Sequence, residues 1–293
     1  GFEMISRPNV KINLGLNVLR KRADGYHDLE TLFVPCFEIS DVLEIVSGDD
    51  YSRTLSHLIS AYGEGSLAQA VSPDGKLMIT IARREGVDWD PLQDLCARAY
   101  YLLGRDYSLP PVKIFLEKLS PVGAGLGGGS SDAAFALKML NSMFSLGLDD
   151  SSLAGYASEL GSDCAFFVHN RPMFGEGRGE KLSAFPIDSI DFGQEAGSAC
   201  RYVLKLVVPD GVAVSTAEAY KGIVPGIPEI SLREILAMPV EQWKGLLSND
   251  FENTVFKAHP ELERIKHSLY DSGAVYASMS GSGSSLFALY ERE

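Results

Sequence analysis

Apolar and polar residues alternate strictly over residues 8–19 of the chain, which read PNVKINLGLNVL. A period of two predicts a half-buried β-strand with one apolar and one polar face. The polar face carries one lysine, two asparagines and a glycine, rather than the threonines and tyrosines that strands prefer. Two interpretations of this face stay open, a solvent-exposed surface and the lining of a pocket. The polar residues are Lys11, Asn13, Gly15 and Asn17.

A glycine-rich stretch, PVGAGLGGGSSDAA at residues 121–134, separates two patterns of different period. The apolar run VKIFLEKL before it predicts a strand, and AAFALKMLNSMF after it has the spacing of an amphipathic helix. Glycines can adopt positive φ and let backbone N–H groups face a ligand closely. The positive end of the helix that follows favours an anion, most simply a phosphate.

Other interpretations of this loop fit the residues less well. No Gly-Lys-Ser/Thr ends it, as a Walker A loop requires. A Rossmann turn needs an acidic residue at a strand end about 20 positions later, and Asp149 lies instead in the polar turn GLDDSS. A flexible glycine-serine linker does not usually open an amphipathic helix.

The rest of the chain alternates predicted strands and helices. We expect strands over 29–46 and 76–82, helices over 91–104 and 149–161, a long loop or short helix over 48–75, and an apolar strand after Asp163. Residues 175–182 predict a tight hairpin with Arg178 at its tip. Strands flanking helices in the last third predict a split βαβ, ferredoxin-like layer.

Length, net charge and cysteine spacing limit the size, partners and location that we expect for this protein. The chain has 293 residues, 45% of them hydrophobic, which is enough for one large or two modest domains. A net charge of −13 argues against a polynucleotide partner. The four cysteines show no zinc spacing and no CxxC pair, so we expect reduced thiols in a cytoplasmic protein without a membrane segment.

At this point the chain resembles a known family. Residues 121–134 resemble the phosphate-binding motif of the GHMP small-molecule kinases, and GGGSS is closest to the branch acting on 4-diphosphocytidyl-2-C-methyl-D-erythritol. Residues 11–31, KINLGLNVLRKRADGYHDLET, are similar to the N-terminal motif of that branch, and other GHMP kinases lack the DGYH segment. LGSDCAFF at 160–167 and SGSGSS at 280–285 resemble two further motifs of the family.

The resemblance implies roles for individual residues. Asp163 is the proposed base, with Lys11 beside it, and Asp163 and Asn13 contact the substrate. Tyr26 and His27 belong to the cytidine end of the site, although the residues alone also allow a plain surface turn. The C-terminal motif, Gly281, Ser282 and Gly283, helps to hold the substrate. The phosphates of ATP are implied to bind Pro121, Gly123, Ala124, Gly125, Leu126, Gly127, Gly128, Gly129, Ser130 and Ser131, with Ser130 or Ser131 as the possible Mg²⁺ ligand.

The expected fold is therefore the α+β, two-domain GHMP kinase fold. We expect an N-terminal ribosomal-protein-S5-domain-2-like domain at 4–165 and a ferredoxin-like domain at 166–293, with the active site in the cleft between them. The resemblance implies phosphorylation of the 2-hydroxyl of a small molecule that carries cytidine diphosphate, with ATP and Mg²⁺, by a monomer or weak homodimer. Another GHMP kinase activity and a non-catalytic nucleotide-binding relative remain alternatives.

Overall fold

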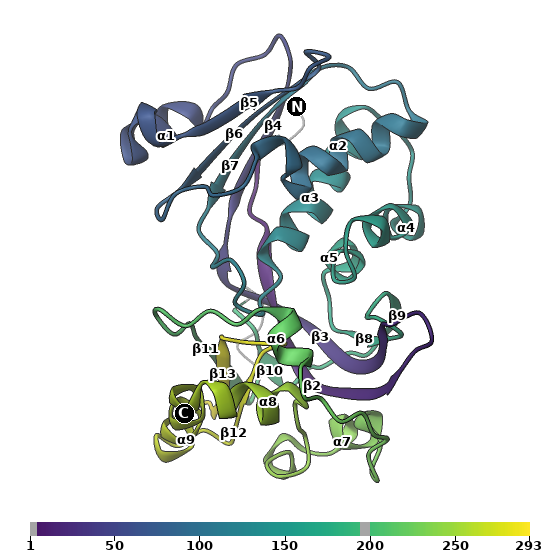
Figure 1. Cartoon of the computed structure of the whole chain (residues 1–293), viewed down its shortest axis with the longest axis vertical. Coiled ribbons are helices and arrows are strands. Elements are labelled where there is room, and N and C mark those ends of the chain that lie inside the picture. The colour runs from purple at the N-terminus through teal and green to yellow at the C-terminus, as the bar shows by residue number, and fades with distance from the viewer. Residues whose placement is uncertain (1–4, 194–199) are drawn as a thin grey trace. The chain divides into compact units, whose positions relative to one another are not determined.

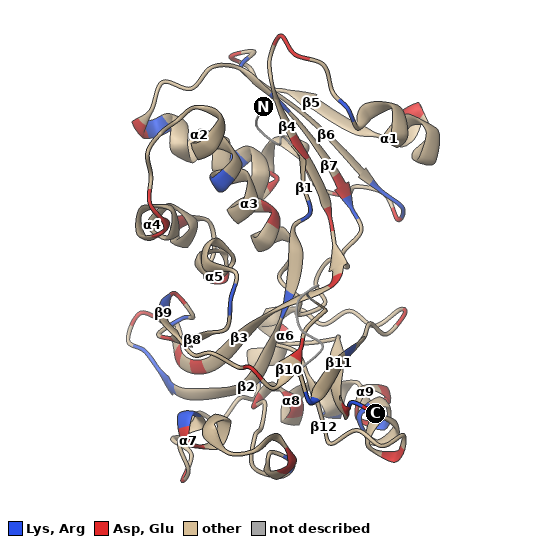
Figure 2. Cartoon of the chain, turned by 180° about the vertical axis from the view of Figure 1, so that it is seen from behind, with Lys and Arg blue, Asp and Glu red and all other residues tan. Residues whose placement is uncertain are grey.

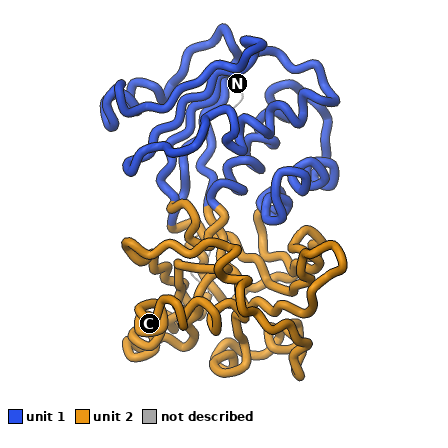
Figure 3. Tube along the Cα trace, in the orientation of Figure 1, with its two compact units in different colours: residues 1–9, 39–120, 128–169 blue, residues 10–38, 121–127, 170–293 orange. Residues whose placement is uncertain are grey.

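The computed structural model describes residues 5–193 and 200–293, and it divides into two compact units (Figure 3). Unit 1 contains residues 1–9, 39–120 and 128–169, and unit 2 contains 10–38, 121–127 and 170–293. The chain therefore enters each unit more than once. The sequence-based division at residue 165 differs from these units, because 10–38 and 121–127 pack with the last third of the chain.

Unit 1 is built on a five-stranded sheet in the order β1-β4-β7-β6-β5. Its pairs are antiparallel except β6 and β7, which run parallel. Helices α2 to α5 lie on one side of the sheet and α1 on the other (Figure 1). The strands are β1 (Ile5–Ser6), β4 (Val42–Ser47), β5 (Ala68–Val71), β6 (Leu77–Arg83) and β7 (Val112–Lys118), and the helices are α1 (Leu55–Tyr62), α2 (Leu95–Asp106), α3 (Gly128–Met143), α4 (Asp150–Leu160) and α5 (Cys164–His169).

Two predictions for unit 1 need correction. Residues 48–75 hold α1 and also the edge strand β5, which the polar sequence did not indicate. The segment after Asp163 is the helix α5 and not a strand. Cys164, Ala165, Phe166, Phe167 and Val168 are all buried, so a continuous apolar run carried no periodicity that could separate a strand from a buried helix.

Unit 2 contains two four-stranded sheets, in the orders β2-β3-β8-β9 and β10-β11-β13-β12. Leu16 and Val18 of β2 belong to a core with Phe251, Leu262 and Leu286. The strands are β2 (Asn9–Lys21), β3 (His27–Ser40), β8 (Met173–Glu176), β9 (Lys181–Ala184), β10 (Ile190–Asp191), β11 (Tyr202–Val207), β12 (Tyr276–Met279) and β13 (Leu286–Glu291), and the helices are α6 (Thr216–Tyr220), α7 (Leu232–Ala237), α8 (Phe251–Ala258) and α9 (Pro260–Asp271).

The predicted strand at residues 8–19 is present as β2, and its polar face is not a solvated one. Lys11, Asn13 and Asn17 expose only 3%, 2% and 6% of their surface. The solvent-exposed interpretation is therefore wrong. Burying an ammonium and two amides costs free energy unless hydrogen bonds compensate. The residues that supply these hydrogen bonds therefore define a polar site inside the protein.

Acidic and basic residues are interspersed along the elements of both units (Figure 2). Among the described residues, no helix combines the length and the apolar character needed to cross a bilayer.

Candidate active site

In unit 2 the glycine loop at 121–127 is held from two directions by backbone hydrogen bonds. The Lys11 amide of β2 donates to the carbonyl of Leu126 at 2.9 Å. The Ser285 amide, at the start of the last strand, donates to the carbonyl of Ala124 at 3.1 Å. Three motifs that are far apart in the sequence are therefore joined at one place.

The side chains at this junction form a buried polar cluster. Lys11 Nζ donates to the carbonyl of Gly125 at 3.0 Å and to Asn13 Oδ1 at 2.5 Å. Ser280 Oγ donates to the same Gly125 carbonyl at 3.0 Å and accepts the amide of Asn13 at 3.3 Å. The ammonium group is thus a fixed positive charge among carbonyl and amide oxygens, close to the glycine loop.

Glycine is required at two positions of this cluster. A Cβ on Gly125 would lie 2.2 Å from the carbonyl oxygen of Ser280, which cannot move away without breaking the turn. A Cβ on Gly281 would lie 3.2 Å from Asn13 Oδ1 and 3.4 Å from Lys11 Nζ. Both residues also have positive φ, +77° and +54°. The two glycine motifs therefore allow the backbones to approach each other and the lysine.

The C-terminal motif forms the turn between β12 and β13. The Ser280 amide donates to the Ser285 carbonyl at 2.8 Å, and the Gly283 amide donates to the Ser280 carbonyl at 3.0 Å. Ser282 is the half-exposed residue at its tip, with Gly281 and Gly283 buried on either side. Of the predicted substrate residues in this motif, Ser282 thus has the side chain open to a ligand.

Sequence reasoning missed two residues that fix this cluster. Asn249 is buried and donates its amide group to the carbonyls of Met279 and Gly281, both at 2.9 Å. Thr31 Oγ1 accepts from Asn13 Nδ2 at 3.0 Å. Asn249 precedes α8 in the sequence SND, which reads as an ordinary helix start, and Thr31 reads as an ordinary strand residue. No local pattern indicated either role.

Tyr26 and His27 follow the turn at Asp24 and Gly25 that joins β2 to β3. Tyr26 is half exposed, and the guanidinium of Arg178 lies 3.6 Å from the centre of its ring. His27 stacks on Tyr220 of α6, with ring centres 4.7 Å apart and an angle of 21° between the planes. Arg178, to which the sequence assigned no role, thus comes from the β8–β9 hairpin to cover an exposed aromatic ring.

In unit 1, α3 begins at Gly128, directly after the loop. Its first turn contains no acidic side chain, so nothing there repels an anion. Ser130 is half exposed, whereas Ser131 is fully buried and its hydroxyl has no hydrogen-bond partner among the described residues. Of the two predicted serines, Ser130 is therefore the one that is partly exposed to solvent.

Asp163 lies in the same unit, immediately before α5. The helices α3 and α5 pack against each other. The turn before α5 reaches the start of α3, because a Cβ on Gly161 would lie 3.9 Å from Ser130 Oγ and 3.3 Å from Cys164 Sγ. The structure thus brings Ser130 close to the turn that carries the half-buried Asp163. Lys11, in contrast, belongs to unit 2.

A buried ionic cluster beneath the start of α3 was also missed. Lys118 Nζ donates to Asp41 Oδ2 at 2.9 Å and to Asp132 Oδ2 at 2.7 Å. Asp41 additionally accepts the Ser120 amide at 2.7 Å and its hydroxyl at 3.0 Å. A Cβ on Gly128 would lie 2.3 Å from Ser120 Oγ, so this cluster directly supports the first turn of α3.

The described residues contain no cluster of three or more histidine, cysteine or acidic side chains that could hold a metal ion.

Comparison with known proteins agrees with these motifs. The N-terminal domain of GHMP kinases matches residues 94–171, and the C-terminal domain of GHMP kinases matches residues 232–293. The 4-diphosphocytidyl-2-C-methyl-D-erythritol kinases of Bacteroides fragilis and Parabacteroides distasonis are each 45% identical to this chain, over 99% of it and over 93% and 92% of their own lengths.

Solved structures agree at the level of the fold. A crystal structure of 4-(cytidine 5'-diphospho)-2C-methyl-D-erythritol kinase has a TM-score of 0.72 at 29% identity, covering 98% of this chain and 90% of that one. The mevalonate kinase of Methanococcus jannaschii has a TM-score of 0.61 at 15% identity, covering 99% and 92%. The fold prediction is therefore confirmed, and the chain belongs to the GHMP kinase family.

Proposed function

We propose that the chain transfers the γ-phosphate of ATP to the 2-hydroxyl of 4-diphosphocytidyl-2-C-methyl-D-erythritol, a step of isoprenoid precursor synthesis. The observation that carries this proposal is 45% identity, over 99% of the chain, with a relative of that name. The exposed aromatic turn at Tyr26, which other GHMP kinases lack, supports the same substrate.

The glycine loop and the start of α3 would hold the nucleotide. Gly123, Gly125 and Gly127 all have positive φ, a backbone conformation in which successive N–H groups of a loop can face an anion together. Gly128 and Gly129 place no side chain at the start of the helix, and Ser130 offers a hydroxyl there. When bound, ATP with Mg²⁺ supplies the phosphoryl group and the charge neutralisation that its transfer requires.

Lys11 and Asp163 would act on the accepting hydroxyl. A carboxylate within hydrogen-bond reach can accept the proton that the hydroxyl loses as the phosphoryl group arrives. The Lys11 ammonium, held in place by Gly125 and Asn13, would offset charge on the transferring phosphate. The bonds that fix Lys11 also orient Asn13, which lies on the same face of β2.

Tyr26 would stack on the cytosine. Its ring is half exposed, and a guanidinium already lies on it at the distance of a stacked pair. A flat heterocycle can stack on the face of the Tyr26 ring, because aromatic side chains bind bases and guanidinium groups through the same ring faces. His27 is held against Tyr220, so its ring has a defined orientation beside Tyr26.

The experiment that tests the substrate is a comparison of acceptors. Consumption of ATP is measured with the cytidyl substrate and, separately, with mevalonate, homoserine and galactose. Turnover with the first alone supports the proposal, turnover with another acceptor identifies a different GHMP kinase, and ATP binding without turnover identifies a non-catalytic relative. Cytoplasmic location and a monomeric or weakly dimeric state stay predictions from the sequence.

The substitution Asp163→Asn tests the proton transfer. The amide keeps the shape of the side chain but cannot accept a proton, so we expect kcat to fall by roughly 10²–10⁴-fold with substrate affinity nearly unchanged. Lys11→Ala should cost a similar factor, and the double variant little more than either single one. If kcat of folded Asp163→Asn falls by less than about tenfold, phosphoryl transfer here proceeds by positioning alone and the base role is rejected.

A further inference from the structure

The sheet of unit 1 has a face that its helix covers only in part. The register of the strands puts Ile5, Val42 and Phe115 on the same face, because Ile5 pairs with Glu44 and Glu44 with Phe115. Helix α1 covers the inner strands of this face, where Leu58 packs with Phe115. Toward the edge strand β1 none of the described helices covers the face, and Ile5 and Val42 are only half buried.

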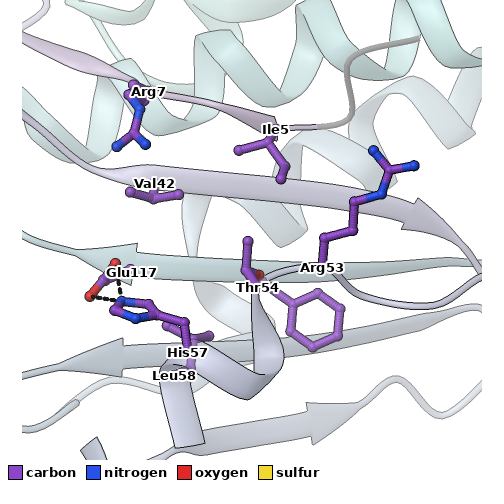
Figure 4. Close-up of a pocket in the computed structure, with 9 residues that line it drawn as sticks. Ile5, Arg7, Val42, Arg53, Thr54, His57, Leu58 and Glu117 are labelled. Carbon is purple, nitrogen blue, oxygen red and sulfur yellow. Dashed lines mark hydrogen bonds and ion pairs between the residues drawn. The ribbon is translucent and has the colours of Figure 1, made fainter. Parts of the chain in front are cut away.

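A cavity of about 410 Å³ occupies this open part of the face (Figure 4). Its volume falls in the range of small-molecule sites, roughly 300–1,000 Å³. Apolar side chains line its centre. The remaining lining residues are polar or charged, namely Arg7, Arg53, Thr54, His57 and Glu117.

The wall that carries Arg53 is fixed to the sheet. Glu44 has a fully buried carboxylate, which accepts the Arg53 amide at 2.7 Å, the Thr54 hydroxyl at 2.9 Å and the Ser52 hydroxyl at 2.5 Å. These hydrogen bonds satisfy polar groups just before α1, and they give the Glu44 carboxylate its partners inside the protein. Hydrogen bonds therefore hold residues 52–55 against the sheet, and these residues form a fixed wall of the cavity.

The second carboxylate of the cavity is also engaged. Glu117 accepts the Tyr62 hydroxyl at 2.7 Å and lies 3.2 Å from His57 Nε2. Burial, together with the neighbouring Glu117, raises the pKa of Tyr62 to about 12, so the tyrosine remains a donor at neutral pH. Both acidic groups next to the cavity thus have internal partners.

The two arginines have no such partners. Within the described part of the chain, no acidic side chain lies within ion-pairing distance of Arg7 or Arg53, and neither guanidinium makes a side-chain hydrogen bond. Figure 4 shows the two guanidinium groups on either side of Ile5, at the rim of the cavity. In a chain with a net charge of −13, a cavity with an apolar centre and two uncompensated cations at its rim is complementary to an apolar anion.

We propose that this cavity is a second binding site of unit 1, for a small molecule with an apolar body and one phosphate or carboxylate group. The apolar body lies against Ile5, Val42 and Phe115. The anionic group lies at the rim, in the positive potential that Arg7 and Arg53 create there. The proposal is independent of the function proposed above, since none of these residues belongs to the candidate active site.

The test uses 2-naphthyl phosphate and 2-naphthoate as probes, with 2-naphthol and inorganic phosphate as controls for the apolar and the anionic part. Methyl NMR spectra of the full chain report Ile5, Val42 and Leu58 directly. We expect saturable shifts of these methyl groups with both anionic probes, and affinities at least about fivefold weaker with either control compound. Binding of only one anionic probe identifies which of the two acidic groups the site accepts.

Three variants locate the site. Arg7→Gln and Arg53→Gln should each weaken binding of the accepted probe by at least about fivefold, while Arg84→Gln, an exposed arginine of the same unit, should leave it unchanged. Val42→Trp fills the cavity and should abolish binding without changing kinase activity. The proposal is overturned if the cavity methyl groups do not shift, if 2-naphthol binds as tightly as the anions, or if the Arg84 control weakens binding as much as the other two.

Discussion

Replacement of Lys118 by Met tests the ionic cluster beneath the phosphate-binding helix. The lysine side chain is 5% exposed, and its partners Asp41 and Asp132 are 0% and 2% exposed. Removing one partner of a buried ion pair costs about 3–5 kcal/mol, because it leaves a charge buried without compensation. Asp41 keeps the donors of Leu119 and Ser120, so the loss falls mainly on Asp132. We therefore expect about 3 kcal/mol, at the lower end of that range.

The loss should depend on pH. Burial raises the pKa of Asp132, and the Lys118 ammonium lowers it, so the substitution Lys118→Met raises it further. A carboxyl group whose folded pKa lies above its unfolded value stabilises the protein least when pH is above both values. Protonation at lower pH removes the buried charge. The difference in stability between wild type and variant should thus shrink as pH falls from 8 toward 5.

Thermal melting measures this effect. A loss of about 3 kcal/mol corresponds to a fall in Tm of roughly 6–12 °C at pH 8. Lys113→Met, which removes a half-buried lysine of the same strand that has no acidic partner among the described residues, is the matched control and should lower Tm by no more than about 2 °C. Adding Asp132→Leu to the Lys118 variant should recover part of the loss, since it removes the orphaned carboxylate. A Tm within about 2 °C of wild type for Lys118→Met, or a deficit that grows at low pH, would refute the reasoning.

Three further substitutions test the candidate active site. Gly127→Val forces a branched side chain to φ +68°, so ATP affinity, measured by calorimetry, should fall at least about tenfold, and an unchanged affinity would remove the loop from the nucleotide site. Tyr26→Ala should weaken the binding free energy of the cytidyl substrate by about 1–3 kcal/mol and leave that of ATP unchanged. Equal losses for both ligands would indicate a folding defect. Asn249→Ala removes the amide that donates to the buried carbonyls of Met279 and Gly281, and only Met279 keeps a second donor, the Ser278 hydroxyl. It should therefore lower stability by about 1–3 kcal/mol and raise KM for the acceptor; an unaltered KM would limit Asn249 to a structural role.

Much of the fold could be predicted because its signals are local. The alternation at 8–19, the strand-loop-helix order around the glycines and the turn before Tyr26 each follow from the periodicity or conformational needs of adjacent residues. The apolar run after Asp163 lacked such a signal, since a helix buried on all sides and a buried strand have the same composition.

The parts of the site that could not be predicted depend on residues distant in the chain. Lys118 meets Asp41 across 77 positions, and Asn249 meets Gly281 across 32. In the sequence, Lys118 looks like the exposed end of a strand, and Asn249 looks like a helix start. Only the fold places a carboxylate or a carbonyl next to them, and burial then makes each hydrogen bond necessary.

The polar face of β2 shows how one simple pattern can combine two physical causes. The polar residues of its first half belong to the candidate active site, because Lys11 and Asn13 contact the glycine loop and the turn between β12 and β13. Its second half serves packing. A Cβ on Gly15 would lie 2.6 Å from the side chains of both Leu232 and Leu247, so only glycine lets these leucines close over the strand. β2 therefore carries both the polar residues of the site and the glycine that allows the core leucines to pack. A register shift of β2 would disrupt both together.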